Sequence, residues 1–144
     1  MSEDEARELL RTGGYGFLSM ASAEGGYGVP LNYAMADDTI YIHCAPEGRK
    51  MRILEHDARV TFCVVGETRV QPEKFTAAYE SAMVCGRARI VHSDDERRRA
   101  LRLIVAKYSA EYATTGEKYI EKSFARTAVI AVDAESFSGK AKRL

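Results

Sequence analysis

The amino-acid sequence predicts a mainly β protein with flanking helices, whose strands form one antiparallel sheet or a small barrel. Six short segments with apolar or alternating residues are typical of strands, and about three further segments have helical spacing. Most of the strands follow one another through short turns, as antiparallel hairpins do. These observations favour hairpin-connected strands over a doubly wound parallel sheet.

Length and composition indicate a single domain, residues 1–144. Domains usually hold roughly 100 to 200 residues, and 46% of this chain is hydrophobic, which is enough for an ordinary core. Lys plus Arg (21) balance Asp plus Glu (21), so no net charge attracts the chain to nucleic acid or anionic membranes. No apolar stretch approaches the about 18 residues of a membrane span. We expect neither a nucleic-acid nor a membrane partner.

The N-terminus and the cysteines indicate a cytoplasmic protein. The chain begins with acidic residues, whereas a secretory signal needs a basic start and an apolar region. Cys44, Cys63 and Cys85 are an odd number without a close pairing pattern, so we expect buried, reduced thiols. No metal site is predicted, because His43 and Cys44 are strand neighbours that point to opposite faces.

The first third of the chain predicts a helix and two strands. Ser2–Glu5 has the form of a capping box, and glycines favoured past a helix end follow at Gly13 and Gly14. Residues 15–22 then form a strand. Residues 27–35 form the second strand of a hairpin, where Pro30 implies an edge position or a bulge.

The middle of the chain predicts two strands around a helix. Residues 39–44 form a third strand. Pro46 suits the first turn of the helix that follows, which ends near His56. Residues 59–65 form a fourth strand. Residues 67–81 have no strong period and are predicted to be a long loop.

The fifth strand, residues 82–91, has an unusual outward face. Arg87 and Arg89 share this face with Met83 and Cys85. Cations beside apolar residues indicate a partly exposed strand face or a contact between subunits.

The C-terminal third predicts one clear helix and one strand. Ser93–Glu96 is a second capping box, which opens an amphipathic helix that ends at Tyr108. The polar stretch after it has one helical turn near 117–122. Residues 126–132 form the last strand, and residues 139–143 form a basic tail.

No standard enzyme motif is present, but residues 40–50 have the pattern of an anion site. A strand leads into a tight turn, and a helix begins after Gly48 with the cations Arg49 and Lys50. Helix N-terminal amides favour an anion, Arg binds oxygens bidentately and Lys adds a point charge. These residues therefore predict a phosphate site. The alternative is a solvated, charged helix face.

Two polar residues lie near this stretch. His43, at the end of its strand, is a candidate ligand contact, acid or haem ligand, or a hydrogen-bonded strand histidine. Asn32 is suited to bond the edge of a heterocycle, or to satisfy backbone groups at the Pro30 bulge.

The runs at 27–33, 40–45 and 47–50, followed by those at 81–91 and 136–142, resemble a known family. They are similar to the nitroimidazole-resistance branch of the pyridoxamine 5′-phosphate oxidase-like flavoproteins. The resemblance covers nearly the whole chain, and its most specific part is His-x-Ala-x-x-Gly-Arg-Lys.

This resemblance implies a six-stranded antiparallel split β-barrel with flanking helices, of the FMN-binding type. It implies a homodimer with FMN in two clefts at the subunit interface. The residues that it matches to the cofactor site are Val29, Leu31, Asn32, Tyr33, His43, Cys44, Ala45, Gly48, Arg49 and Lys50. His43 is also the candidate catalytic residue. The loop at 67–81 would line or cover the substrate side.

The function implied is an FMN-dependent reductase that takes hydride from NAD(P)H and reduces a small electrophile, such as a nitroaromatic or a quinone. One alternative is a non-catalytic flavin-binding or sensor protein. Others are a haem-binding and a deazaflavin-binding split barrel. The compact turn before Arg49 suits a single phosphate, which favours FMN.

Overall fold

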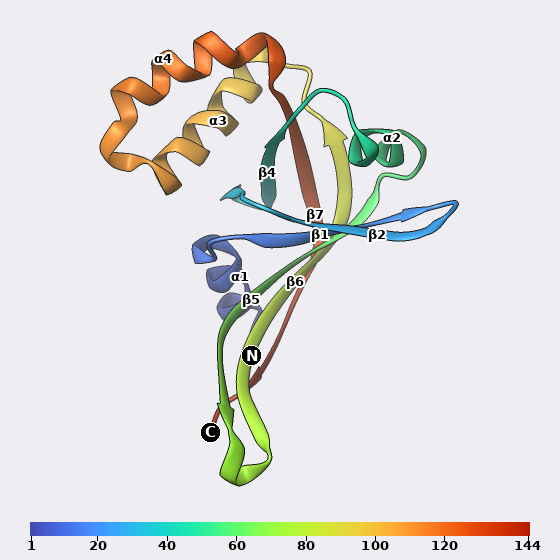
Figure 1. The fold of residues 1–144 in the computed structure, drawn as a ribbon, viewed down its shortest axis with the longest axis vertical. Helices are drawn as coiled ribbons and strands as arrows, with labels where there is room; N and C mark the ends of the chain where they lie inside the picture. Colours follow the sequence, from blue (N-terminus) through green and yellow to red (C-terminus); the bar gives the residue numbers. More distant parts are fainter.

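Seven strands and four α-helices make up the computed structural model, which describes residues 1–144 (Figure 1). The helices are α1 (Glu3–Thr12), α2 (Arg49–His56), α3 (Asp94–Tyr108) and α4 (Ala113–Ser123). The strands are β1 (Gly16–Ser22), β2 (Gly25–Leu31), β3 (Ala34–Ala36), β4 (Thr39–Cys44), β5 (Arg59–Gln71), β6 (Thr76–Ile90) and β7 (Ala128–Lys142). Short 3₁₀ turns lie at Pro72–Lys74, Ala110–Tyr112 and Phe124–Arg126. None of the helices is both long and apolar enough to cross a membrane.

The strands form one antiparallel sheet in the order β2-β1-β5-β6-β7-β4-β3. Its two end strands are neighbours in sequence, because β2 ends at Leu31 and β3 begins at Ala34. Three Cα steps reach at most roughly 11 Å, so the ends of the sheet must lie close together. The sheet therefore curls into a barrel that is split beside Asn32 and Tyr33.

This closure corrects the predicted strand 27–35, and with it the strand count. The strand breaks at Asn32, and its two parts lie at opposite ends of the sheet order. The apolar alternation continues through the break, since Leu31 and Tyr33 both pack inward. Seven strands result where six were expected.

The core has two parts, one inside the barrel and one outside it. Inside, the largest fully buried side chains include Phe62, Tyr33 and Leu18. The outer part lies where α3 and α4 cover β4 and β7, and it includes Tyr41 and Val129. Because both faces of β4 are covered, its central residues are buried in succession.

A long hairpin arm replaces the predicted loop at 67–81. β5 continues to Gln71 and β6 begins at Thr76, and the paired strands extend away from the barrel (Figure 1). The predicted tail at 139–143 is also mostly strand, because β7 pairs with β6 as far as Lys142. Side chains on the β5 strand of the arm are mostly exposed, and those on its β6 strand, residues 76–81, are all half-buried, so no alternation of buried and exposed residues marks the arm.

The helices begin where their capping residues lie rather than at the first residue suited to a helix. Ser2 and Glu5 form the complete predicted capping box of α1. Helix α2 begins at Arg49 rather than at Pro46, because Gly48 occupies the N-cap. The single turn expected near 117–122 is part of the longer helix α4.

The three cysteines are free, but they are not buried as expected. Cys63 and Cys85 lie on the outward face of β5 and β6; Cys63 is half-buried and Cys85 is exposed. Cys44 is half-buried, with its sulfur 3.8 Å from the Met51 sulfur.

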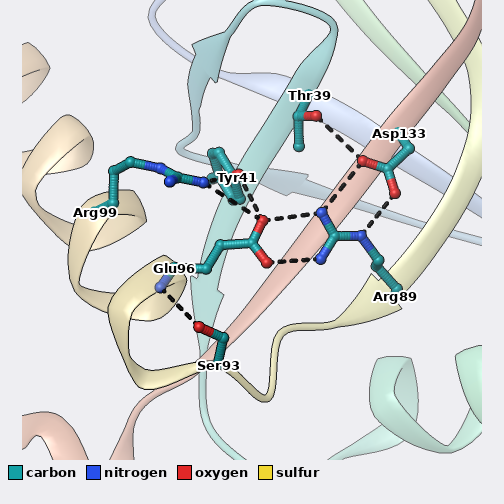
Figure 2. A network of polar contacts seen from close by, with 7 residues as sticks. All are labelled: Thr39, Tyr41, Arg89, Ser93, Glu96, Arg99 and Asp133. Atoms are coloured by element: carbon teal, nitrogen blue, oxygen red, sulfur yellow. Dashed lines mark hydrogen bonds and ion pairs between the residues drawn. The ribbon is translucent and has the colours of Figure 1, made fainter.

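A polar network fastens the start of α3 to the sheet (Figure 2). Arg89 donates to both oxygens of Glu96, at 2.8 and 2.9 Å, and its Nε donates to Asp133 at 2.7 Å. The Tyr41 hydroxyl donates to Glu96 at 2.8 Å. The Ser93 hydroxyl oxygen accepts a hydrogen bond from the Glu96 amide, but the Glu96 carboxylate accepts none from the Ser93 amide, although a full capping box requires this second bond. The carboxylate is instead committed to Arg89 and Tyr41.

Replacing Glu96 with glutamine should lower the free energy of unfolding at pH 7 by about 1–2 kcal/mol, because the charge-assisted hydrogen bonds from Arg89 are lost. The cost stays in this range because solvent partly screens the exposed Arg89 side chain. Arg89 first, and Tyr41 second, lower the pKa of Glu96 to about 2. The carboxylate therefore stabilises the fold above its ordinary pKa of 4.5, and this stabilisation is lost as the pH falls towards 2.

Urea unfolding at pH 7 and pH 3 tests this. The difference in stability between wild type and Glu96→Gln should shrink at the lower pH. Glu121→Gln, at an exposed ion pair with Arg98, is the matched control and should change little. Equal effects of the two substitutions would contradict the structural role of Glu96.

Candidate functional site

The start of α2 presents an uncapped, cationic helix end. Gly48 has φ 143°, a conformation that favours glycine, and no side chain caps the first amides. The first turn has no acidic residue. Arg49 is half-exposed, with its guanidinium 4.3 Å from the centre of the Tyr27 ring and 3.9 Å from Glu24. The free backbone amides at the start of the helix and the Arg49 guanidinium can together bind an anion.

His43 and Cys44, at the end of β4, lie within the influence of Lys50. His43 is exposed, yet partial desolvation first and Lys50 second lower its pKa from 6.5. Burial raises the pKa of the Cys44 thiol, against an opposing effect of Lys50. At neutral pH the imidazole is therefore uncharged and the thiol is protonated. Cys44 contacts Met51 in the core, so the two neighbours face opposite ways as predicted.

An open hollow of about 450 Å³ brings predicted residues from separate strands together. Its lining residues are Tyr15, Pro30, Leu31, Asn32 and His43. Tyr15 was not among the predicted site residues. It is 64% exposed and precedes β1, so its only sequence signal was its position at the entry of a strand.

Of the ten predicted site residues, only Leu31, Asn32 and His43 line this hollow. Val29 is half-buried on β2, an end strand of the sheet, where backbone groups facing away from β1 have no neighbouring strand in the sheet order. Ala45 is exposed in the turn that leads to α2. No residue of the β5–β6 arm lines the hollow of the same chain, although the segment 67–81 was expected to cover the substrate side.

Tyr33 has a core side chain. It is fully buried, its hydroxyl donates to the Leu10 carbonyl, and its ring packs edge-on against Phe62 at 4.8 Å. Burial raises its pKa. The Lys107 amino group lies 3.7 Å from the centre of the ring without a hydrogen-bond partner, and burial lowers its pKa to about 8. Only the backbone of Tyr33 faces the split of the barrel beside Asn32 and Tyr33, which we call the seam.

Tyr108, at the end of α3, holds that backbone. Its hydroxyl accepts from the Tyr33 amide at 3.1 Å and lies 3.0 Å from the Tyr33 carbonyl. It is also 2.7 Å from the Gly14 carbonyl. One hydroxyl thus ties together the segments that carry Tyr15 and Asn32 into the hollow.

Tyr108→Phe should cost about 1–2 kcal/mol of unfolding free energy, because the part-buried Tyr33 amide loses its partner. Hydrogen exchange at the Tyr33 amide should become faster. Tyr119→Phe is the control, since that side chain is 65% exposed and its hydroxyl makes no hydrogen bond to the protein. Unchanged exchange at Tyr33 would show that the hydroxyl does not hold the seam.

The antiparallel sheet closed by a two-residue link, with a hollow at its seam and a cationic helix start nearby, defines a split β-barrel. Over residues 2–141 the chain matches the family model of pyridoxamine 5′-phosphate oxidase. The chain therefore belongs to this family. No curated protein shows significant sequence similarity to it.

Solved structures share the fold. One is a candidate 5-nitroimidazole antibiotic resistance protein from Bacteroides thetaiotaomicron, with 23% identity, a TM-score of 0.78, and coverage of 97% of this chain and 84% of that one. Another is an FAD- and haem-binding protein from Mycobacterium smegmatis, with 18% identity, a TM-score of 0.85, and coverage of 99% and 72%. A third is an FAD-binding protein from Mesorhizobium loti, with 23% identity, a TM-score of 0.69, and coverage of 99% and 96%. At these sequence identities the similarity shows a shared fold and nothing more specific.

Proposed function

We propose that the chain binds FMN and acts as an NAD(P)H-dependent reductase of small electrophiles, such as nitroaromatics or quinones. The supporting observation is that a phosphate-type site adjoins a ring-sized hollow. His43 lines the hollow at the end of β4, and only the short segment 44–48 separates it from Arg49 and Lys50 at the start of α2, so the cationic helix start lies near the hollow. Two of the solved structures with this fold are FAD-binding proteins, which supports a flavin as the ligand.

The residues present fit a flavin phosphate and ring. Arg49, Lys50 and the uncapped amides after Gly48 would hold the phosphate. The hollow would take the ring, and the free backbone edge of β2 near Val29 would bond its polar rim. A bound flavin supplies the hydride and electron transfer, while the protein orients both reactants.

His43 is the candidate catalytic residue of this site. Its lowered pKa makes it a neutral imidazole at pH 7, with one N–H donor and one acceptor nitrogen. It can therefore orient a substrate oxygen by donating a hydrogen bond, without bringing a positive charge into the hollow.

A second copy of the chain is the proposed partner, seated on the outward face of the sheet. The register places Pro30, Phe17, Cys63 and Met83 in one row across four strands. Phe17 is 44% exposed and Met83 38% exposed. The row starts at the hollow, which Pro30 lines, so a copy bound to this face would also border the ring site. This supports a homodimer with the cofactor at its interface.

Light scattering with Met83→Glu tests the dimer. A charge on an apolar interface should give a monomer that binds flavin more weakly. The control Phe75→Glu, at the exposed tip of the arm, should keep the molar mass of a dimer. A wild-type monomer that still binds flavin would refute the interface assignment while leaving the cofactor assignment in place.

Absorption spectra with added cofactor, followed by turnover, test the function. We expect flavin bands with FMN, and NADH or NADPH oxidation that depends on an added nitroaromatic or quinone. Flavin binding without turnover would favour a non-catalytic flavin protein. A Soret band with haem and no flavin binding would favour His43 as a haem ligand, and binding of a deazaflavin alone would favour that cofactor.

A further inference from the structure

A second cavity, which we call the α2 cleft, lies between α2 and the β1–β2 turn. Its volume is about 470 Å³, comparable to that of the hollow beside His43. Arg49, Arg52 and His56 line it from one face of α2, at positions i, i+3 and i+7. Ser22 and Glu24 line it from the turn.

The charge of the α2 cleft is unbalanced. Arg52 forms no ion pair, and Arg49 has only the 3.9 Å contact with Glu24. The Glu24 side chain is 86% exposed, so solvent screens most of its attraction. Two arginines and a histidine on one wall, against one screened carboxylate, favour an anionic ligand.

The start of α2 separates this cleft from the hollow. The Lys50 charge acts on His43 and Cys44, on the side of the hollow. Arg49 turns instead towards Tyr27 and Glu24, on the side of the cleft. A ligand with one phosphate at the helix start would therefore have the α2 cleft next to it, away from the hollow.

We propose that the α2 cleft binds a phosphate group of a dinucleotide, in addition to the phosphate held at Gly48–Lys50. The inference rests on the proposed flavin function. Two ligands carry such a phosphate group. One is FAD, whose second phosphate is bonded directly to the first, and the other is NADPH bound beside FMN. The cleft volume lies within the range of ligand pockets, about 300–1,000 Å³, and Arg52 is the side chain that acts on the second phosphate alone.

The test compares ligands rather than a single affinity. Dissociation constants for FMN and FAD, and for NADPH with FMN saturating, are measured on wild type, Arg52→Ala and Arg52→Lys. For FAD or for NADPH, Arg52→Ala should weaken binding roughly tenfold, as expected for a lost charge-assisted bond. FMN affinity should stay within about twofold. Arg52→Lys should recover part of the loss, because it keeps the charge.

Arg126→Ala is the matched control, since Arg126 is exposed and forms no ion pair; it should change none of the constants. The ligand that responds to Arg52→Ala identifies the source of the second phosphate. Equal weakening of FMN and FAD would overturn the inference, because the cleft would then belong to the first phosphate site. FMN binding with no response of either dinucleotide would overturn it too. A protein that binds no flavin would overturn the proposed function itself.

Discussion

Replacing Arg49 and Lys50 together by alanine should weaken FMN binding about 100-fold or more. Each charge-assisted hydrogen bond to the phosphate contributes at least about 1.5 kcal/mol, and about 1.4 kcal/mol corresponds to a factor of ten. Neither side chain is buried in the core, so the fold should tolerate the change. Flavin fluorescence titration measures the dissociation constant, and thermal unfolding without ligand checks that the fold is intact.

The control for this experiment removes a similar pair of cations elsewhere. Lys122 in the last turn of α4 and Arg126 in the 3₁₀ turn after it are exposed and form no ion pairs. Their double alanine variant has the same change in net charge and should bind FMN as wild type does. If the two double variants had equal affinity, the phosphate site would not lie at the start of α2.

Replacing Phe62 with alanine should destabilise the fold by about 3–5 kcal/mol, which is typical of a large aromatic side chain lost from a core. Phe62 is fully buried on β5, and its ring packs against Tyr33. A side chain at Gly16 would overlap the Phe62 ring, so Gly16 provides the space that the ring fills. Urea unfolding measures the loss.

Phe75→Ala is the companion variant, because Phe75 at the tip of the arm is 97% exposed. Its cost should stay within about 0.5 kcal/mol. The contrast separates the packing of the barrel interior from the general loss of an aromatic side chain. Similar costs for the two variants would mean that the ring of Phe62 does not fill the barrel.

Segments with one buried face could be predicted from the sequence, and segments without one could not. Helix α1 has a capping box and an apolar stripe, and α3 likewise has a cap and buried positions. The arm has mostly exposed side chains on β5 and uniformly half-buried ones on β6, so neither strand has a buried face that alternates with an exposed one, although the two strands pair along their length. In α4, Thr114, Thr115 and Gly116 are poor helix formers, and contact with α3 outweighs their propensity.

The candidate site was predictable only where a local pattern existed. Gly48, Arg49 and Lys50 form such a pattern, because a helix start and its cations are adjacent in sequence. The hollow has no local pattern, because it forms where the two ends of the sheet meet. Tyr15 and Arg52 therefore appear as lining residues only in the folded chain.

The position of β7 has a consequence for biosynthesis. This strand is translated after the other six, yet it lies between β6 and β4 and joins the two parts of the sheet. Until residues 128–142 leave the ribosome, the edges of β6 and β4 remain without their partner, and exposed strand edges promote aggregation. The barrel can therefore close only after the last strand has emerged. We expect nascent chains that stop before residue 128 to need chaperones to stay unaggregated.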